Sequence, residues 1–332
     1  MNQTAPTHLH HLDPNVSYFL GVDGGGTRTR VALVDQAGTE CARADGPPTL
    51  IDPADPAATV GVIADLCREA ASKGGADLPV AGLWAGIAGA GTEPTRSVVE
   101  TALREAGLSS LTSVGADAEA TFYDAFPSGP GILLIAGTGS IALGRGADGS
   151  RLRVGGWGLH LGDEGSGYRI GMSALHAFAR GEDGRGVSTE LRDSVLEVLG
   201  LAGPGDLIKW IASAQKADVA SLVPLIFEVA EAGDQAALTV IEEAVDELVG
   251  HVRTLVRRLE PWPATPEVAL AGGLLKENRP LRVRMIRAIE VLPCRHQARV
   301  LDGVRGACSL AMGLADLTDG SPAPWPESLS GN

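Results

Sequence analysis

The feature that most constrains the fold is a strand–turn–strand pattern that occurs twice. The first copy spans Tyr18–Val34 and is interrupted by the turn Asp23-Gly24-Gly25-Gly26-Thr27. The second spans Ile132–Gly144 and is interrupted by Gly137-Thr138-Gly139-Ser140. Short apolar runs joined by a few small residues are typical of β-hairpins. The repeat predicts two domains of like topology, each opening with a hairpin and facing the other across a cleft.

Composition narrows the class of protein. The chain has 332 residues, of which 44% are hydrophobic, which is enough for two cores. Its net charge of −14 disfavours binding to bulk nucleic acid or to anionic membranes, because both require basic patches. We find no apolar run long enough for a membrane span and no signal peptide. The four cysteines lie far apart without a Cys-x-x-Cys pair, which argues against a zinc site and predicts a cytoplasmic protein.

Apolar periodicity predicts an α/β order of elements. The first domain, placed at residues 17–122, adds to its hairpin a strand at 41–44, a helix at 57–71, a strand at 79–87, a helix at 94–106 and a strand at 111–116. A helix from Asp117 to about Phe126 follows. The second domain, placed at residues 123–318, adds a strand at 151–154, a mostly helical region to residue 260, a strand at 268–271 and a helix at 304–316.

Apolar residues at three- and four-residue steps from Leu238 to Leu259 mark one face of a long helix. This face either packs into a core or forms a dimer seam. We favour the core, because a seam is normally argued from at least three or four heptads with charged flanks.

The segment Gly155–Tyr168 contains six glycines and the adjacent carboxylates Asp163 and Glu164. Glycine permits positive φ and close approach of the backbone, so the segment is interpreted as backbone held close to a ligand. The alternative is an ordinary surface loop.

Both glycine-rich turns can form anion-binding nests of backbone N–H groups, and Thr27 can add a hydroxyl donor. Neither turn is a P-loop, because no Gly-Lys-Ser/Thr follows and the next element is a strand. Each turn alone could be a plain tight turn. Two such turns, one opening each domain, indicate a polyphosphate held between them.

Two carboxylates and a glycine pair have both structural and functional interpretations. Asp23 ends the first strand and either caps the turn or holds Mg²⁺, directly or through water. Asp117 ends the last strand of the first domain and either caps a helix or accepts a proton from a substrate hydroxyl. Gly272-Gly273 follows a strand and permits either close strand–helix packing or an adenosine lying on the backbone.

Together, the segments Asp23–Thr27, Gly137–Ser140, Gly155–Ser166 and Ala271–Gly273 resemble the N-acetylglucosamine and glucosamine kinase group of the BadF/BadG/BcrA/BcrD ATPase family. This family belongs to the actin-like ATPase superfamily, which includes hexokinase. The resemblance covers residues 17–316, and Gly155–Ser166 is its most specific part. It implies an α/β fold of two ribonuclease-H-like domains facing each other across a nucleotide-binding cleft.

The resemblance also implies an activity: transfer of the γ-phosphoryl group of ATP to the 6-hydroxyl of N-acetylglucosamine or glucosamine, with Mg²⁺ as cofactor. By the resemblance Asp117 would be the catalytic base and the protein a homodimer, while Asp23 is the candidate metal ligand from its position at the end of the first strand. The residues that would bind ATP are Gly24, Gly25, Gly26, Thr27, Gly137, Thr138, Gly139, Gly272 and Gly273. Those that would bind the sugar are Thr49, Asp117, Gly156, Trp157, Gly158 and Asp163.

At one position the chain departs from the family pattern. The sugar kinases usually place an asparagine where this chain has Thr49, and a hydroxyl offers fewer hydrogen bonds than an amide. The sequence therefore leaves open the choice between glucosamine, N-acetylglucosamine and N-acetylmuramate.

Two other functions are compatible with parts of the sequence. One is an ATP-driven activator of a 2-hydroxyacyl-CoA dehydratase or benzoyl-CoA reductase, which holds an iron–sulfur cluster on cysteines. No cysteine lies between Cys67 and Cys294, which disfavours this function. The other is a catalytically idle sugar or nucleotide sensor, against which the intact Asp23, Asp117 and Asp163 argue.

Overall fold

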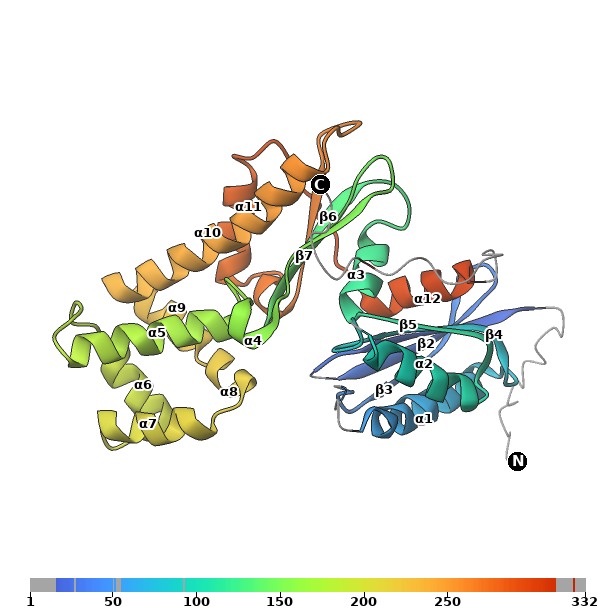
Figure 1. Cartoon of the computed structure of the whole chain (residues 1–332), viewed down its shortest axis with the longest axis horizontal. Helices are drawn as coiled ribbons and strands as arrows, with labels where there is room; N and C mark the ends of the chain where they lie inside the picture. Colours follow the sequence, from blue (N-terminus) through green and yellow to red (C-terminus); the bar gives the residue numbers. More distant parts are fainter. Residues whose placement is uncertain are drawn as a thin grey trace, which may run out of the picture. The chain divides into compact units, whose positions relative to one another are not determined.

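The computed structural model describes residues 16–314, except Thr27, Leu50, residues 52–54 and Thr92, and also describes Trp325. The chain divides into two compact units (Figure 1). Of the described residues, the first unit contains those up to Ser128 together with those from Val300 onward, and the second contains Gly129–Arg299. None of the helices in the described ranges combines the length and the apolar composition of a membrane span.

A mixed β-sheet forms the centre of the first unit. Its strands are β1 (Tyr18–Gly24), β2 (Thr29–Asp35), β3 (Glu40–Gly46), β4 (Val80–Ile87) and β5 (Ser109–Gly115). They lie in the order β3-β2-β1-β4-β5, with β1 to β3 antiparallel and with β4 and β5 parallel to β1. The hairpin predicted from the first copy of the repeat is therefore present, and it continues into a parallel half of the same sheet.

Helices cover both faces of this sheet. They are α1 (Pro56–Gly74), α2 (Thr95–Glu105), α3 (Asp117–Ala125) and α12 (Gly303–Gly313). Because successive strand residues point to opposite faces, Leu20 packs in the cluster that contains residues of α1, whereas Phe19 packs in the cluster that contains residues of α12.

The position of α12 differs from the predicted domain boundaries. The sequence places residues 123–318 in one domain, but the structure divides the chain after Ser128 and returns α12 to the first unit, against β1 and α3. Small residues permit this close packing. A Cβ on Gly306 would lie 1.8 Å from the Ala120 carbonyl oxygen, and a Cβ on Gly21 would lie 2.4 Å from the Cys308 nitrogen. Sequence order does not reveal that the chain returns to its first unit.

The second unit is built on a second mixed sheet. Its strands are β6 (Gly131–Ala136), β7 (Ser140–Arg145), β8 (Arg151–Gly155), β9 (Glu267–Ala271) and β10 (Arg295–His296). They lie in the order β10-β9-β6-β7-β8. The β6–β7–β8 part is antiparallel, and β9 runs parallel to β6. This topology repeats that of the first unit, as the second copy of the hairpin predicts.

Most of the second unit is helical. Its helices are α4 (Gly158–Leu161), α5 (Gly167–Glu182), α6 (Leu191–Leu199), α7 (Pro204–Ser213), α8 (Lys216–Ala220), α9 (Val223–Glu231), α10 (Gln235–Arg258), the 3-10 helix η1 (Gly273–Leu275) and α11 (Pro280–Ile289). The predicted apolar stripe lies on α10, where Ile241, Leu248 and Val252 are fully buried in the core of the unit. The stripe is therefore core, not a dimer seam.

Candidate active site

Parallel strands bring the two predicted acidic residues of the first unit to one edge of its sheet. Asp23, near the end of β1, is paired in register with Gly86 of β4, and Gly86 is paired with Gly115 of β5. Asp117 comes two residues after Gly115. Carboxyl ends of parallel strands form the edge at which open α/β sheets bind ligands. Glycine is required at this edge, because a Cβ on Gly115 would lie 2.6 Å from the buried Trp84 ring.

Asp117 is the first residue of α3. The N-cap is Ala116, whose N–H donates to Glu119 Oε1 at 3.3 Å, so Asp117 does not cap the helix itself. Its Oδ1 accepts a hydrogen bond from the Ala118 N–H at 2.9 Å. Burial, and secondly the negative charge of Asp23, raise the pKa of Asp117 from 3.8 to about 6. A carboxylate with a pKa near neutrality is suited to accept and release a proton.

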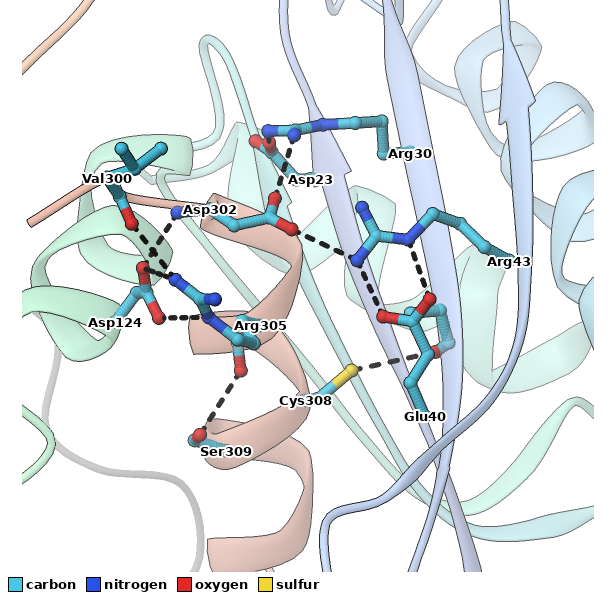
Figure 2. A network of polar contacts seen from close by, with 11 residues as sticks. Asp23, Arg30, Glu40, Arg43, Asp124, Val300, Asp302, Arg305, Cys308 and Ser309 are labelled. Carbon is cyan, nitrogen blue, oxygen red and sulfur yellow. Dashed lines mark hydrogen bonds and ion pairs between the residues drawn. The ribbon is translucent and has the colours of Figure 1, made fainter.

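Asp23 lies in a network of charged residues rather than alone (Figure 2). Arg30 of β2 forms an ion pair with Asp23 Oδ2, and its other terminal nitrogen lies 2.7 Å from Asp302 Oδ1. Gly303 also lies against the carboxylate, because a Cβ there would be 2.8 Å from Asp23 Oδ2. The start of α12 therefore encloses one side of Asp23.

The same network fastens α12 to the rest of the unit. Asp302 Oδ2 accepts a hydrogen bond from Arg43 at 3.0 Å, and the Asp302 N–H donates to Asp124 Oδ2 at 2.7 Å (Figure 2). Arg305 donates to both oxygens of Asp124, at 2.7 and 2.9 Å. Asp124 is almost fully buried, so this bidentate pair satisfies a carboxylate that water does not reach.

Two hydrogen-bonded threonines pack against the base of the first glycine turn. Thr49 Oγ1 lies 2.8 Å from Thr29 Oγ1, and a Cβ on Gly24 would lie 2.4 Å from it. Thr49 is only 2% exposed. Its hydroxyl therefore stabilises the base of the turn from within the unit. Gly25 and Gly26 lie beyond it at the tip, and Thr27 lies outside the described residues.

The second glycine turn is tied to the start of α5. The Gly137 N–H donates to the Gly139 carbonyl at 2.9 Å, and the Gly137 carbonyl accepts from the Gly167 N–H at 2.8 Å. The Thr138 carbonyl accepts from the Tyr168 N–H at 3.3 Å, while the Thr138 residue itself is exposed. The turn thus has a fixed backbone and an accessible tip, as an anion-binding turn requires.

Asp163 lies directly beneath this second turn. Its Oδ1 accepts from the Ser140 N–H at 3.1 Å, and its Oδ2 accepts from Lys216 Nζ at 2.6 Å. Asp163 is 4% exposed and has a positive φ of 61°. Sequence reasoning missed Lys216, which is 53 residues away in α8; no local motif marks it.

Several glycines of the segment Gly155–Tyr168 have internal packing roles. A Cβ would lie 2.3 Å from His251 Nε2 at Gly155, 2.8 Å from Ile141 Cδ1 at Gly156, and 2.5 Å from Leu248 Cγ at Gly165. Gly155, Gly156 and Gly165 also have φ near 70°. Glycine is therefore needed at these positions because other atoms lie close to the backbone, as the sequence indicated. These atoms belong to α10 and β7 of the same unit and not to a ligand.

The exposed part of this segment is its tip. Gly158 has a φ of 79° and open space around it, and Trp157 is 49% exposed. The Arg153 guanidinium lies 5.1 Å from the centre of the Trp157 ring, within cation–π range. These residues can contact a ligand. The segment also forms the short helix α4, which neither the ligand-binding nor the surface-loop interpretation predicted.

Arg169 of α5 holds α4 in place. Its side chain donates to the carbonyl oxygens of Gly162 at 2.9 Å, His160 at 3.2 Å and Leu159 at 3.3 Å. These are carbonyls at the end of a helix, which have no partner within the helix and attract positive charge. Arg169 is a second residue of the site region that the sequence did not indicate.

The glycine pair at the end of β9 lies beside the second glycine turn. Gly272 has a φ of 93°, and a Cβ there would lie 2.3 Å from the Ala136 carbonyl oxygen. A Cβ on Gly137 would lie 3.5 Å from the Gly273 nitrogen. The structure therefore brings together two motifs that are more than 130 residues apart in the sequence.

Gly273 also lines a pocket of about 510 Å³ between α8, α9, η1 and α11. Its apolar wall includes Val223, Phe227, Leu274 and Leu281, and its rim carries Glu228, Glu231 and Arg279. A pocket of this size with apolar walls and a few polar groups is typical of small-molecule sites.

The buried cysteines do not gather at this site. Cys67 and Cys308 lie in the two separate cores of the first unit, and Cys294 lies in the core of the second. Burial raises the pKa of the Cys67 and Cys308 thiols to about 12, so both stay protonated near neutral pH.

Comparisons with known proteins agree with the geometry. The chain is 31% identical to the N-acetylmuramic acid/N-acetylglucosamine kinase of Clostridium acetobutylicum over 263 residues, which cover 78% of this chain and 86% of that protein. It is 33% identical to the N-acetyl-D-glucosamine kinase of Dictyostelium discoideum over 260 residues, which cover 73% and 80%.

Solved structures give the same fold. A proposed N-acetylglucosamine kinase from Chromobacterium violaceum superposes with a TM-score of 0.72 at 27% identity, covering 89% of this chain and 99% of that one. A ROK family glucokinase from Streptomyces griseus superposes with a TM-score of 0.52 at 17% identity, covering 89% and 99%, and shares the fold alone. The predicted α/β class is confirmed as the actin-like ATPase fold. The model of the BadF/BadG/BcrA/BcrD ATPase family matches residues 20–292. The chain belongs to this family.

Proposed function

We propose that the protein is an ATP-dependent amino-sugar kinase that phosphorylates the 6-hydroxyl of N-acetylglucosamine or glucosamine. The observation that carries this proposal is Asp117, whose pKa is raised to about 6 at the carboxyl edge of the first sheet, beside Asp23. The kinases from Clostridium acetobutylicum and Dictyostelium discoideum described above carry names of sugar kinases, which supports the same reaction class.

In this mechanism Asp117 accepts the proton of the sugar hydroxyl. The hydroxyl oxygen forms a bond to the γ-phosphorus, the bond from the γ-phosphorus to the β–γ bridging oxygen breaks, and ADP leaves. The proton then passes from Asp117 to solvent. Phosphoryl transfer demands mainly positioning and charge stabilisation from a protein, so Asp117 orients the hydroxyl as much as it deprotonates it.

Asp23 would hold a magnesium ion carried by the nucleotide, directly or through water, beside the ion pair that its Oδ2 forms with Arg30. Mg²⁺ is usually bound by one or two carboxylates together with water and substrate phosphates, so Asp23 is a sufficient protein anchor. Within the described residues, no cluster of three or more His, Cys, Asp or Glu side chains is placed to bind a metal. Bound Mg²⁺ would neutralise charge on the phosphates.

The proposal assigns nucleotide binding to both glycine turns and to the pocket beside Gly273. Adenosine would occupy the 510 Å³ pocket, with Gly272-Gly273 at its edge, and Gly137, Thr138 and Gly139 would bind phosphate oxygens. Trp157, Gly158 and Asp163 would bind the sugar. Each Asp163 oxygen already accepts one hydrogen bond and has a second lone pair for a sugar hydroxyl.

A coupled assay of ADP release tests the proposal. Glucosamine, N-acetylglucosamine and N-acetylmuramate are offered separately, with Mg²⁺ and with EDTA, and the product is identified by phosphorus NMR. We expect Mg²⁺-dependent ADP release with at least one sugar and a phosphate on its 6-hydroxyl. Asp117→Asn should lower kcat by about 100-fold or more, the usual contribution of a general base.

The matched control is Asp65→Asn, which changes an exposed aspartate on α1 and should leave kcat unchanged. ADP release that no sugar increases would contradict the proposal. Tight sugar binding without turnover would indicate a sensor. Iron in an oxygen-sensitive brown preparation would indicate a dehydratase activator.

A further inference from the structure

Lys216 has an unusual position among the four lysines of the chain. Its Nζ lies 2.6 Å from Asp163 Oδ2, and a Cβ on Gly139 would lie 2.9 Å from the same nitrogen. The ammonium group therefore lies against the backbone of the second glycine turn. Its side chain remains 33% exposed, so a ligand at the turn can reach it.

A chain of neighbouring residues connects the 510 Å³ pocket with this lysine. Gly273 lines the pocket and lies against Gly137, and the turn then runs through Thr138 to Gly139, which lies against Lys216. Helix α8 connects the same two places, because Lys216 is its first residue and Ala220, its last residue, lines the pocket. A nucleotide with its base in the pocket and its phosphates on the turn would direct those phosphates towards Lys216.

A phosphate at the second glycine turn would also need a nearby cation, because Asp163 is negatively charged. Asp163 is nearly buried beneath the turn, and its carboxylate would repel an approaching phosphate. Lys216 neutralises Asp163 and has three N–H donors, of which Asp163 accepts one. Two donors remain for phosphate oxygens.

We propose that Lys216 binds the polyphosphate chain of the nucleotide and shields it from Asp163. This inference deepens the proposed function and rests on it. Sequence alone does not reveal this role, since Lys216 lies outside every glycine-rich motif and reaches the turn only through the packing of α8 against α5.

The test compares the binding of ADP and adenosine by isothermal calorimetry in wild type and Lys216→Met. We expect Lys216→Met to weaken ADP binding by about 10- to 100-fold, the range for losing a charge-assisted hydrogen bond, and to leave adenosine binding unchanged. Lys216→Arg should recover most of the ADP affinity. In kinetics, KM for ATP should rise more than KM for the sugar.

Two further variants separate phosphate binding from folding. Lys209→Met removes an exposed lysine of α7 and should leave both affinities unchanged. The double variant Asp163→Asn, Lys216→Met leaves no unpaired buried charge, so it should fold and still bind ADP weakly. Full ADP affinity in the double variant would overturn the inference, because the defect of Lys216→Met would then come only from the Asp163 charge left without its partner.

The outcomes also distinguish this inference from the proposed function. Wild type that binds neither ADP nor adenosine would overturn both. Wild type that binds ADP normally, with equal affinity in Lys216→Met, would overturn the role of Lys216 alone. Parallel loss of ADP and adenosine binding in Lys216→Met would also overturn it, because a phosphate contact cannot affect a ligand without phosphate.

Discussion

Asp117, the proposed catalytic base, lowers the stability of the fold at neutral pH, because its carboxyl group has a raised pKa. Its raised pKa of about 6 means that the folded protein binds this proton more tightly than the unfolded chain does. The contribution of Asp117 to the free energy of unfolding is therefore greatest below the ordinary pKa of 3.8 and falls as the pH rises through about 6. At neutral pH the ionised carboxylate destabilises the fold.

Asp117→Asn should accordingly stabilise the protein at neutral and alkaline pH. The amide cannot ionise, and its oxygen can still accept the hydrogen bond from Ala118. About half of the pKa shift lies above pH 5, so the gain in unfolding free energy over wild type should grow by about 1 kcal/mol between pH 5 and pH 8. Urea denaturation across this range measures it. A gain that shrinks with rising pH would contradict the assignment.

Sequence reasoning identified the residues whose positions follow from strand ends. Asp23 and Asp117 could be placed at one edge because parallel strands end together. The burial of Thr49 and the contacts of Lys216 could not be predicted. The Thr49 hydroxyl is hydrogen-bonded to the Thr29 hydroxyl. Lys216 reaches Asp163 only because of the way the helices pack.

At the scale of elements, α4 is a single helical turn that depends on its neighbour. A helix this short has little stability of its own, because nucleation costs more than so few hydrogen bonds return. Arg169 supplies additional hydrogen bonds that stabilise α4, because it donates to carbonyl oxygens at the end of this helix. The hairpins and the long α10 were predictable from local patterns, whereas α4 was not.

Arg169→Met should loosen α4 and the exposed Trp157 that precedes it. Under the proposed function, KM for the sugar should rise by about tenfold, the cost of losing hydrogen bonds from a charged group, while KM for ATP stays nearly constant. Steady-state kinetics with each substrate varied gives both values. Arg180→Met, an exposed position near the other end of α5, is the control. Equal rises in both KM values would show a wider collapse of the unit.

At the scale of the molecule, the two units have separate hydrophobic cores. The repeat in the sequence predicted two domains of like topology. It could not predict that α12 completes the first one, because the contacts of α12 with β1 join residues nearly 300 positions apart. Helical periodicity gives a helix its apolar face but not the sheet that the face will cover.

The substitution Gly306→Ala tests whether the packing of α12 stabilises the first unit. The added Cβ would meet the Ala120 carbonyl oxygen at 1.8 Å, so α12 would have to move away from α3. We expect the first unit to lose about 3 kcal/mol of unfolding free energy, as for an overpacked core. Hydrogen exchange should show faster exchange in β1 and β4, with protection of β6 and β9 retained. Gly313→Ala, with open space around it, is the matched control. Uniform loss of protection in both units would contradict independent cores.

The late position of α12 in the chain has a consequence for biosynthesis. Domains begin to fold as they leave the ribosome. The strands of the first unit emerge early, but the helix that covers Phe19 and Trp84 emerges only after the whole second unit. Until then, one apolar face of the first sheet lacks the part of its cover that α12 supplies, and this face is where we expect chaperones to bind while translation continues.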